Sequence, residues 1–515
     1  MNEKETGSFY TPTDLVDYMV SFAKKRIKPR SILEPSAGDG RFAQPLSAFK
    51  AKITMIENDF QKANTLVEKF GNCCTAFCED FIKYANNSKE VYDLIIGNPP
   101  YIAKKKLTEE QCQRSEELIE KFDLEKNIFQ NLWVSFVLAS IKCLDSGGAI
   151  FFVLPFEFLQ VQYAEKLRIF LEKKFNTIEI ITFEEKIFDD IEQDICLVYL
   201  TNEEVAKPYI KYTTLHSAQE SRQVFQSVIM RNKPLKKWSN CILNDEETEI
   251  LLDLAGKFPN INCFGNISPG IVTGANSFFI VSESTINKFE LPQKHVLPIV
   301  TKSSLIDPLL LFEDQDFNQM ISDEHRTHLM NLTGFKEELF SNELKEYILE
   351  GKKRELDKRY KCYKRPRWFD VPIIEKGDLC FFKRYSTIPR LIVNRAGVHT
   401  TDISYNVRLN QNYDAASFAF CFYNSLTLAL CEYSGRFYGG GVGELVPSEF
   451  KNLALPYRKI EHADILTLDR MFRNRTELAQ IVDYVDNIVL KGLSADEISL
   501  LQGIRKRYLI RRLKK

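Results

Sequence analysis

The sequence predicts an α/β protein whose first half is built on a mostly parallel sheet, and two observations support this. Short apolar runs alternate with stretches of helical periodicity, and polar turns follow several of these runs directly. The regular alternation fades after Thr201. The expected sheet has seven strands with flanking helices, and the strands lie near residues 31–35, 52–57, 74–79, 92–97, 148–154, 177–183 and 195–200.

A polar stretch at 233–238 separates this α/β part from the rest of the chain. The residues after it have a mixed α+β pattern with glycine-rich segments at 265–274 and 439–443, and the C-terminal residues have helical periodicity. We therefore predict three domains, over residues 1–238, 239–458 and 459–515.

The first polar turn, Glu34–Gly40, follows the predicted strand at 31–33. Glycines at a strand-to-helix turn let a ligand approach the backbone closely. Residues Gly38 to Ala43 also fit the dinucleotide pattern G-x-G-x-x-A, so a nicotinamide cofactor is an alternative. The carboxylate of Glu34 would repel a pyrophosphate but attract a cation, which favours the sulfonium cofactor S-adenosylmethionine.

Acidic residues also follow the next two strands. Glu57 ends the strand at 52–57, and a carboxylate there suits the two hydroxyls of a ribose, which both cofactors contain. Asp80 and Phe81 follow the strand at 74–79, where Asp80 can accept a hydrogen bond from an adenine amino group and Phe81 can cover the ring. The alternative is an ordinary loop acid and a core aromatic.

The fourth turn, Asn98-Pro99-Pro100-Tyr101, follows the strand at 92–97. The prolines fix φ and remove two donors, so the carbonyl of Pro99 and the side-chain oxygen of Asn98 are held as acceptors that suit an exocyclic amino group. Tyr101 can stack on the flat ring that carries this group, a contact worth roughly 1–3 kcal/mol. The turn therefore indicates a nucleobase site, against the alternative of a proline-rich turn with a surface tyrosine.

These four turns are expected at one edge of the sheet. Ligands of open α/β sheets bind outside the carboxyl ends of the strands, and all four turns follow strands. We expect Glu34, Glu57, Asp80 and Asn98 to meet there.

Composition narrows the class of protein to which the chain can belong. The 515 residues are 44% hydrophobic, with no apolar run of about 18 residues and no charged-then-apolar leader, so we expect a cytoplasmic protein with no membrane segment. The twelve cysteines include no C-x-x-C pair, and we expect reduced thiols and no metal site. The net charge of −1 gives no global indication of nucleic-acid binding.

Two segments are locally basic. Nine Lys or Arg side chains lie between 352 and 367, interleaved with Tyr360 and Tyr363, and seven lie between 505 and 515. Phosphate contact is the functional interpretation of both segments, and a solvated helix face is the alternative. In the first segment the candidate DNA contacts are Lys361, Lys364, Arg365 and Arg367.

The order of motifs resembles the gamma group of DNA adenine-N6 methyltransferases, of the TaqI type. The matching segments are Thr6–Thr13, Leu33–Gly40, Glu79–Phe81, Asn98–Tyr101, Gly147–Pro155 and, before the strand at 195–200, the aromatic Phe188. The segments Gly270–Ile280 and Tyr438–Pro447 are similar to parts of the recognition domains of type II members. The resemblance covers nearly the whole chain, more loosely after residue 220.

The resemblance implies a class I S-adenosylmethionine-dependent methyltransferase fold at 1–238, a target recognition domain at 239–458 and a helical C-terminus. It implies methylation of a flipped-out adenine in double-stranded DNA, in a bacterial or archaeal type II restriction-modification system. A cognate restriction endonuclease would act on the same site without a stable complex. The alternatives are N4-cytosine, RNA-base or protein-glutamine methylation, and a non-catalytic DNA-binding module.

The resemblance also implies site residues. Asn98, Pro99, Tyr101 and Phe188 would act on the base, the last two by stacking, and no general base is needed. The cofactor would be held by Thr11, Glu34, Ser36, Gly38, Glu57, Asp80, Phe81 and Asn98. In the C-terminal half, the DNA contacts would include Arg436, Tyr438, Gly439 and Gly440.

Overall fold

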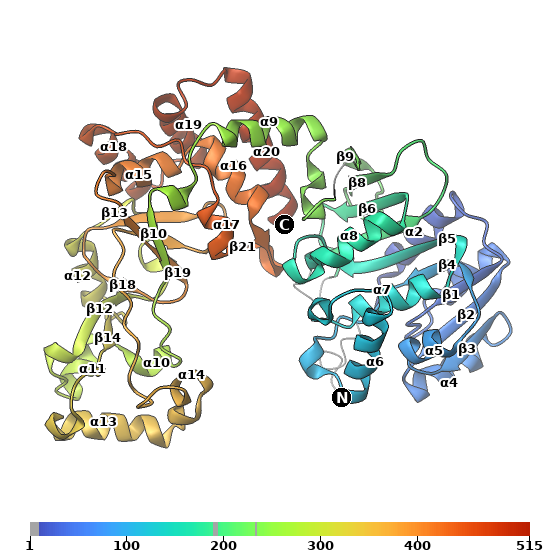
Figure 1. Cartoon of the computed structure of the whole chain (residues 1–515), viewed down its shortest axis with the longest axis horizontal. Helices are drawn as coiled ribbons and strands as arrows, with labels where there is room; N and C mark the ends of the chain where they lie inside the picture. The colour runs from blue at the N-terminus through green and yellow to red at the C-terminus, as the bar shows by residue number, and fades with distance from the viewer. Residues whose placement is uncertain (1–9, 189–193, 232–233, 515) are drawn as a thin grey trace. The chain divides into compact units, whose positions relative to one another are not determined.

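The computed structural model describes residues 10–188, 194–231 and 234–514. The chain forms two compact units (Figure 1). Unit 1 contains the residues up to Thr248 together with Arg436–Gly441 and Ile510–Lys515, and unit 2 contains Glu249–Gly435 and Val442–Leu509. Residues 6–9 of the first motif and residue 233 of the predicted linker lie outside the described residues.

Unit 1 is built on a sheet with the strand order β3-β2-β1-β4-β5-β7-β6-β8-β9, nine strands in the described part of the chain. The β5–β7, β7–β6 and β8–β9 pairs are antiparallel and the others are parallel. The strands are β1 (Ser31–Glu34), β2 (Lys52–Glu57), β3 (Cys74–Cys78), β4 (Tyr92–Gly97), β5 (Leu144–Pro155), β6 (Thr177–Phe183), β7 (Ile195–Thr201), β8 (Tyr209–Leu215) and β9 (Gln223–Met230).

The expected count of seven strands is wrong by two. Strands β1 to β7 occupy the predicted positions, but β8 and β9 extend the sheet beyond β6. They form a hairpin at the sheet edge, where β9 alternates between exposed and buried side chains over much of its length. A half-exposed edge hairpin lacks the continuous apolar run that marks buried strands such as β6 and β7.

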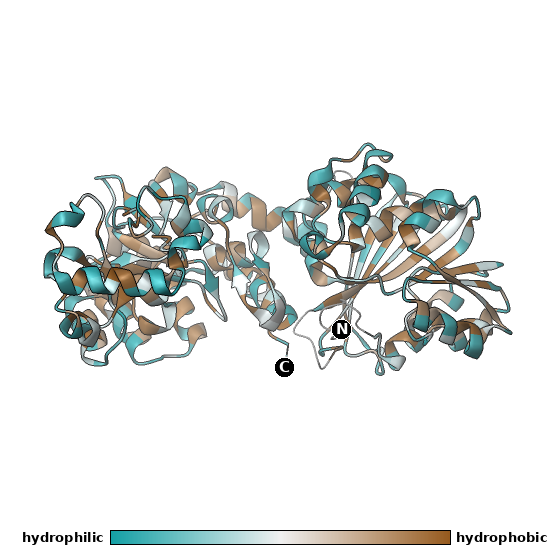
Figure 2. Cartoon of the chain, turned by 90° about the horizontal axis from the view of Figure 1, so that it is seen from below, coloured by the Kyte–Doolittle hydropathy of each residue, from teal (hydrophilic) through white to brown (hydrophobic). Residues whose placement is uncertain are grey.

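Helices cover the sheet of unit 1. Buried apolar side chains of α2 pack against Ile53, Leu94 and Phe151 in one hydrophobic cluster, and α7, which is buried over almost its whole length, packs on β5. Figure 2 shows hydrophobic colour on the strands and hydrophilic colour on the outer sides of many helices. The helices are α2 (Thr13–Lys24), α3 (Ala43–Leu46), α4 (Phe60–Phe70), α5 (Phe81–Asn87), α6 (Glu109–Glu120), α7 (Trp133–Lys142) and α8 (Glu165–Lys174).

Unit 2 contains two larger sheets, with orders β10-β19-β15-β17-β13 and β11-β14-β12-β18, and a pair β16–β21. Each larger sheet has its own cluster of buried apolar side chains. The strands are β10 (Gly265–Pro269), β11 (Ile280–Val281), β12 (Val296–Val300), β13 (Leu311–Phe312), β14 (His328–Met330), β15 (Leu379–Phe382), β16 (Arg384–Tyr385), β17 (Arg390–Asn394), β18 (His399–Thr400), β19 (Ser404–Leu409) and β21 (Gly443–Glu444).

The helices after β9 are mostly in unit 2. Two of them, α15 and α16, are almost fully buried. The set is α9 (Asp245–Gly256), α10 (Asn276–Phe279), α11 (Glu283–Lys288), α12 (Asp314–Ser322), α13 (Asn342–Lys353), α14 (Tyr360–Tyr363), α15 (Ala415–Phe422), α16 (Ser425–Ser434), α17 (Pro447–Lys451), α18 (His462–Arg473), α19 (Leu478–Val489) and α20 (Ala495–Arg512). Of the described helices, none is long and apolar enough to span a membrane.

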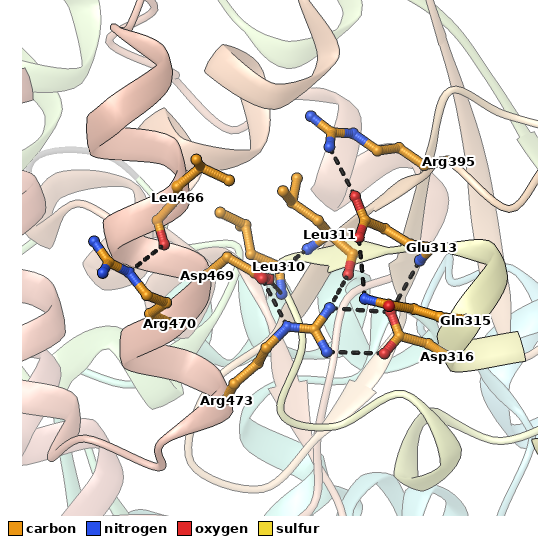
Figure 3. A network of polar contacts seen from close by, with 10 residues as sticks. All are labelled: Leu310, Leu311, Glu313, Gln315, Asp316, Arg395, Leu466, Asp469, Arg470 and Arg473. Atoms are coloured by element: carbon orange, nitrogen blue, oxygen red, sulfur yellow. Dashed lines mark hydrogen bonds and ion pairs between the residues drawn. The ribbon is translucent and has the colours of Figure 1, made fainter. Parts of the chain in front are cut away.

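The C-terminal helices do not form a third unit, which differs from the expected segment 459–515. Asp469 of α18 accepts hydrogen bonds from the backbone N–H groups of Leu310 and Leu311, at 3.1 and 2.9 Å (Figure 3). Arg473 binds Asp316 of α12 at 2.8 Å. Because the buried Asp469 satisfies the backbone at the start of β13, α18 packs as part of the same unit as the preceding residues.

Candidate active site

The carboxyl ends of β1, β2 and β4 and the turn after β3 surround a cavity of about 630 Å³ in unit 1. The four turns expected to converge do so. The cavity is lined by ten of the predicted site residues, namely Thr11, Glu34, Ser36, Gly38, Glu57, Asp80, Phe81, Asn98, Pro99 and Tyr101.

The glycine turn is held in place by Glu57. One carboxylate oxygen of Glu57 accepts the N–H of Gly38 at 2.8 Å and the other accepts the N–H of Asp59 at 2.8 Å. Gly40 has φ of +80°, and a Cβ there would lie 2.5 Å from the ring of Phe70. The turn therefore requires glycine at position 40 and brings backbone to the cavity wall.

Glu34 has an environment that suits a bound cation. Its side chain is 1% exposed, and its Oε2 atom has no hydrogen-bond partner among the described residues. Burial raises the pKa of Glu34 well above its usual range, and the nearby carboxylates of Asp39 and Glu57 raise it further. A buried acceptor without a partner, in the wall of a cavity, fits a ligand that carries a positively charged donor.

Asp80 has a structural contact as well as a place in the cavity wall. Its Oδ1 atom caps α5 by accepting the N–H of Lys83 at 2.9 Å, and it lies 3.5 Å from Nη1 of Arg114. Phe81, the first residue of α5, is buried, and its ring centroid lies 5.1 Å from the ring centroid of Phe136. The cap fixes the direction in which the Asp80 carboxylate points.

The turn Asn98–Tyr101 is tied to both neighbouring strands. Ser36 Oγ, after β1, donates to the carbonyl of Asn98 at 3.0 Å, and Tyr101 donates its hydroxyl to the carbonyl of Val153 in β5 at 3.1 Å. Burial raises the pKa of Tyr101 well above its usual range, so this hydroxyl stays protonated at neutral pH. The half-buried Tyr101 ring is thereby fixed at the wall of the cavity.

Phe188 is not among the residues that line the cavity. Its side chain is 8% exposed and packs in the same hydrophobic cluster that Tyr101 contacts. The next residues, 189–193, lie outside the described part of the chain.

Sequence reasoning missed several lining residues. Tyr10 lies against the cations of Arg41 and Lys62, at 4.9 and 5.3 Å from its ring centroid, and its place beside Thr11 in the first motif was an available signal. Leu132 and Phe136 line the cavity from the start of α7. Their i, i+4 spacing is that of an ordinary core helix, so nothing in the sequence distinguishes them.

In unit 2, the guanidinium groups of Arg365 and Arg367, both expected to contact DNA, form hydrogen bonds within the unit. Arg365 donates to the carbonyls of Val272 and Thr273 at 3.0 and 2.7 Å. Arg367 forms two hydrogen bonds with Asp370, at 2.9 and 2.8 Å, and also donates to the carbonyls of Phe335 and Leu332. Backbone carbonyls and a carboxylate thus accept from several of the N–H donors of both side chains.

Lys361 and Lys364 lie in or directly after the short helix α14 with two exposed tyrosines. Tyr360 and Tyr363 are 65% and 75% exposed. Lys364 Nζ donates to the hydroxyl of Tyr360 at 2.7 Å and lies 4.3 Å from the centroid of its ring. The result is a surface of mixed cationic and aromatic groups.

The segment Arg436–Gly441 belongs to unit 1. Tyr438 is 40% exposed, and Gly440 and Gly441 have φ of +76° and +72°. A Cβ at Gly440 would meet no atom within 4 Å, whereas one at Gly441 would lie 2.3 Å from the carbonyl oxygen of Arg512. The glycine run is therefore a tight turn with an open side at Gly440.

No group of three or more His, Cys, Asp or Glu side chains in the described ranges is placed to hold a metal ion. The twelve cysteines are all free thiols.

Two family models match the chain. Residues 24–188 match the Eco57I restriction-modification methylase, and residues 235–490 match the C-terminal domain of the type II methyltransferase M.Eco57I. Together they span the two parts that the fold separates.

Two curated relatives match over almost their whole lengths. The chain is 22% identical to type II methyltransferase M.AccI of Acinetobacter calcoaceticus, covering 96% of this chain and 92% of that protein. It is 25% identical to type II methyltransferase M.HindII of Haemophilus influenzae, covering 97% and 96%. Among solved structures, the type IIL restriction-modification enzyme MmeI in complex with DNA shares the fold, with a TM-score of 0.55, 12% identity and coverage of 96% of this chain and 75% of that one.

The fold and the comparisons define a methyltransferase of a restriction-modification system, and hence an enzyme. More narrowly, the chain belongs to the Eco57I-type family of type II restriction-modification methyltransferases.

Proposed function

We propose that this enzyme methylates the N6 amino group of an adenine within a specific double-stranded DNA sequence, as a TaqI-type gamma-group enzyme with S-adenosylmethionine as the methyl donor. The observation that carries the proposal is the position of Asn98–Tyr101 at the end of β4, in the same cavity as Glu34, Glu57 and Asp80. One half of the cavity suits a cofactor and the other suits an amino group on a flat ring.

The residues present fit S-adenosylmethionine. Glu34 offers a buried, unpartnered oxygen to the positive methionine end, and Glu57 lies where a ribose would be bound. Asp80 and Phe81 would hold the adenine ring of the cofactor, while Thr11, Ser36 and Gly38 complete the wall of the cavity. When bound, the cofactor supplies an electrophilic methyl group.

Asn98 and Pro99 would orient the substrate amino group. Its nitrogen lone pair is delocalised into the ring, and two acceptors for its protons favour the geometry in which the lone pair points out of the ring plane. The same acceptors stabilise the positive charge that develops on the nitrogen. The proton becomes acidic once the nitrogen is alkylated, so no catalytic His or Cys is required.

The base must leave the duplex to reach these acceptors, as in other methyltransferases that act on DNA. The ring of Tyr101, fixed through its hydroxyl by Val153, would stack on the flipped base. Phe188 lies in the hydrophobic cluster against which Tyr101 packs, and a stacking role requires that it become accessible when DNA binds.

Unit 2 would select the DNA sequence, which extends the expected recognition domain to include most of the C-terminal helices. Lys361 and Lys364 with their exposed tyrosines would contact phosphates, and Arg365 and Arg367 would hold the loops beneath them. In unit 1, Arg436, Tyr438, Gly439 and Gly440 would make a further DNA contact. The complex of MmeI with DNA, whose protein shares the fold, supports DNA as partner.

The expected biological setting is a type II system in which a separate endonuclease acts on the same site without a stable complex. The names of M.AccI and M.HindII, both type II methyltransferases, support the type II setting.

N4-cytosine methylation is the second candidate. Cytosine carries an amide-like exocyclic amino group that the same two acceptors can orient, and nothing in the geometry of Asn98 and Pro99 distinguishes the two rings. The adenine assignment therefore depends on the motif resemblance.

Long-read sequencing of DNA from cells that express this enzyme tests the proposal. We expect a new methylated motif with N6-methyladenine at one position of each strand or half-site. A motif with N4-methylcytosine would establish the second candidate, and the absence of any new methylated motif would refute both.

A further inference from the structure

Arg511 and Arg512, near the end of the chain, are buried in unit 1, and Lys514 is half-buried. The Arg511 side chain is 3% exposed, and its Nη1 atom lies 2.6 Å from Oδ2 of Asp194. Lys514 Nζ lies 2.8 Å from the other oxygen of the same carboxylate. Two cations therefore share the half-buried carboxylate of Asp194, which leaves neither of them for phosphate contact.

Arg511 also contacts the end of β5. Its guanidinium carbon lies 3.9 Å from the centroid of the Phe156 ring, and its Nε donates to the hydroxyl of Tyr212 in β8 at 3.3 Å. Phe156 is the residue directly after β5, and its N–H donates to the carbonyl of Asp194 at 2.8 Å. The C-terminus thus joins the end of β5 to the start of β7.

This junction lies next to the proposed base site. In the β5–β7 register Pro155 pairs with Ile195 and Val153 pairs with Leu197. Val153, two residues before Pro155, provides the carbonyl that accepts the Tyr101 hydroxyl. A short covalent path therefore leads from the Asp194 cluster to the contact that fixes the Tyr101 ring.

Phe437 reinforces the same junction. Its ring lies 4.7 Å from the ring of Phe156, and its N–H donates to Oε1 of the buried Gln160 at 3.2 Å. Gln160 returns a hydrogen bond to the carbonyl of Phe437. Arg512 donates to the carbonyl of Gly441 at 2.6 Å, so the glycine turn and the C-terminus are bonded to each other.

The charges of this cluster stay ionised near neutral pH. Burial alone would raise the pKa of Asp194, but Arg511 and Lys514 lower it below its usual range. Burial and the neighbouring Arg511 lower the pKa of Lys514 to about 8. Buried ion pairs of this kind contribute little net stability, but they specify geometry when all partners are present.

We propose that Arg511 and Lys514 are positioning residues for methyl transfer: through Asp194 and Phe156 they fix the ends of β5 and β7, and thereby the Val153 carbonyl that holds the Tyr101 ring. This inference rests on the proposed function, because it gives the cluster a role in the same base site. An error of about 1 Å in the position of a reacting group reduces turnover by roughly 100-fold.

Hydrogen–deuterium exchange of the full-length enzyme without DNA gives the first test. Arg511→Met keeps the length of the side chain but removes its charge, and Lys514→Met does the same at the second cation. We expect faster exchange of the Phe156 amide, which is bonded to Asp194, and of the Leu132 amide, which is bonded to the carbonyl of Ile102 beside Tyr101. Lys506→Met, an exposed change on the same helix, is the matched control.

Methyl-transfer kinetics give the second test, on whichever DNA motif the sequencing experiment identifies. We expect kcat of Arg511→Met to fall by about 10- to 100-fold, with cofactor Kd unchanged and partial recovery in Arg511→Lys. Unchanged kcat and unchanged exchange in both folded Met variants would overturn the proposal. A loss of cofactor affinity as large as the loss in kcat would also overturn the proposal, since unit 1 would then be disturbed as a whole.

The two tests separate this inference from the proposed function. A methylated cytosine would refute the adenine assignment. The effect of Arg511→Met on kcat could then be measured with cytosine as the target base. If the wild-type enzyme methylated no DNA, the exchange experiment would still decide whether the C-terminus holds the Tyr101 turn.

Discussion

Asn98 and Tyr101 share one turn but make different kinds of contact. Asn98 is proposed to orient the amino group that reacts, whereas Tyr101 provides a ring anchored through its hydroxyl to Val153. Because the first contact strengthens as charge develops and the second is a stacking contact, their substitutions should separate in size and in the step affected.

Asn98→Ala is expected to abolish methyl transfer and to keep most of the cofactor affinity, since Glu34, Glu57 and Asp80 remain. Single-turnover assays and calorimetric titration with S-adenosylmethionine measure the two properties separately. Retained methyl transfer would contradict the role given to this side chain.

Tyr101→Ala is expected to be milder and to cost about one stacking contact, roughly 1–3 kcal/mol, mainly in binding of the flipped base. Tyr101→Phe is the matched variant, because it keeps the ring and removes only the hydrogen bond to Val153. Fluorescence of 2-aminopurine at the target position reports flipping, and a loss as severe as that of Asn98→Ala would reject the distinction between acceptor and stacking ring.

Glu34 should make the stability of the cofactor-free enzyme depend on pH. Its pKa is raised in the folded state, so the stabilising effect of the protonated form is complete below the unfolded pKa and is lost as pH rises through the folded pKa. The slope is at most about 1.4 kcal/mol per pH unit. Urea unfolding between pH 5 and about 9 should show this fall, and Glu34→Gln should remove it while weakening cofactor binding.

In and after α14, Lys361 and Lys364 are proposed to contact phosphates, whereas Arg365 is proposed to stabilise unit 2. Lys361→Ala and Lys364→Ala should each lower the slope of log K against log salt by about 0.9, because each removes one phosphate contact. Lys491→Ala, an exposed change elsewhere in unit 2, should leave the slope unchanged. Arg365→Met should instead lower the stability of unit 2, since it removes hydrogen bonds to Val272 and Thr273.

The binding of labelled duplex at several salt concentrations distinguishes these outcomes. If Arg365→Met lowered the slope of log K against log salt as much as Lys361→Ala does and left the stability of unit 2 unchanged, the Arg365 guanidinium would be a DNA contact.

The sequence predicts elements best where burial dictates a continuous apolar pattern. Strands β1, β2 and β4 to β7 follow from such runs, whereas β3, which was also predicted, is mostly exposed at the edge of the sheet. The β8–β9 hairpin escapes this reasoning because its outer side chains are exposed. Arg365 and Arg367 resemble phosphate ligands in sequence, and only the fold brings carbonyls such as that of Thr273 within reach.

A helix boundary shows the same limit. The helical pattern from 461 to 490 continues through Asn474, but Arg475 has φ of +53°, and α18 and α19 are separate helices. Apolar periodicity continues on both sides of this break, so the pattern alone cannot locate it.

For the molecule as a whole, each unit has its own core, and damage to one should leave the other folded. Asp469→Ala removes the acceptor for the N–H groups of Leu310 and Leu311 and one partner of Arg473. Each unsatisfied buried donor costs about 1–3 kcal/mol. Calorimetry should show a lower transition temperature for unit 2, with cofactor affinity unchanged.

Arg470→Ala is the matched control on the same helix, because its Nε donates to the carbonyl of Leu466 at 3.4 Å and its Nη2 donates to Oγ1 of Thr467 at 3.2 Å, both within α18. Its unfolding should match that of the wild type. Loss of cofactor binding in Asp469→Ala would show that the two cores do not unfold independently.

The path of the chain decides how this enzyme can be re-engineered. Unit 1 is completed only by Arg436–Gly441 and by the hexapeptide that begins at Ile510, so unit 2 is a two-part insertion and not a C-terminal appendage. A chimera that joins a foreign specificity module after residue 248 would discard Phe437 and Arg511, which contact Phe156 at the end of β5. To change the DNA specificity, residues 249–435 and 442–509 must both be replaced. The native residues between and after these two ranges must be kept.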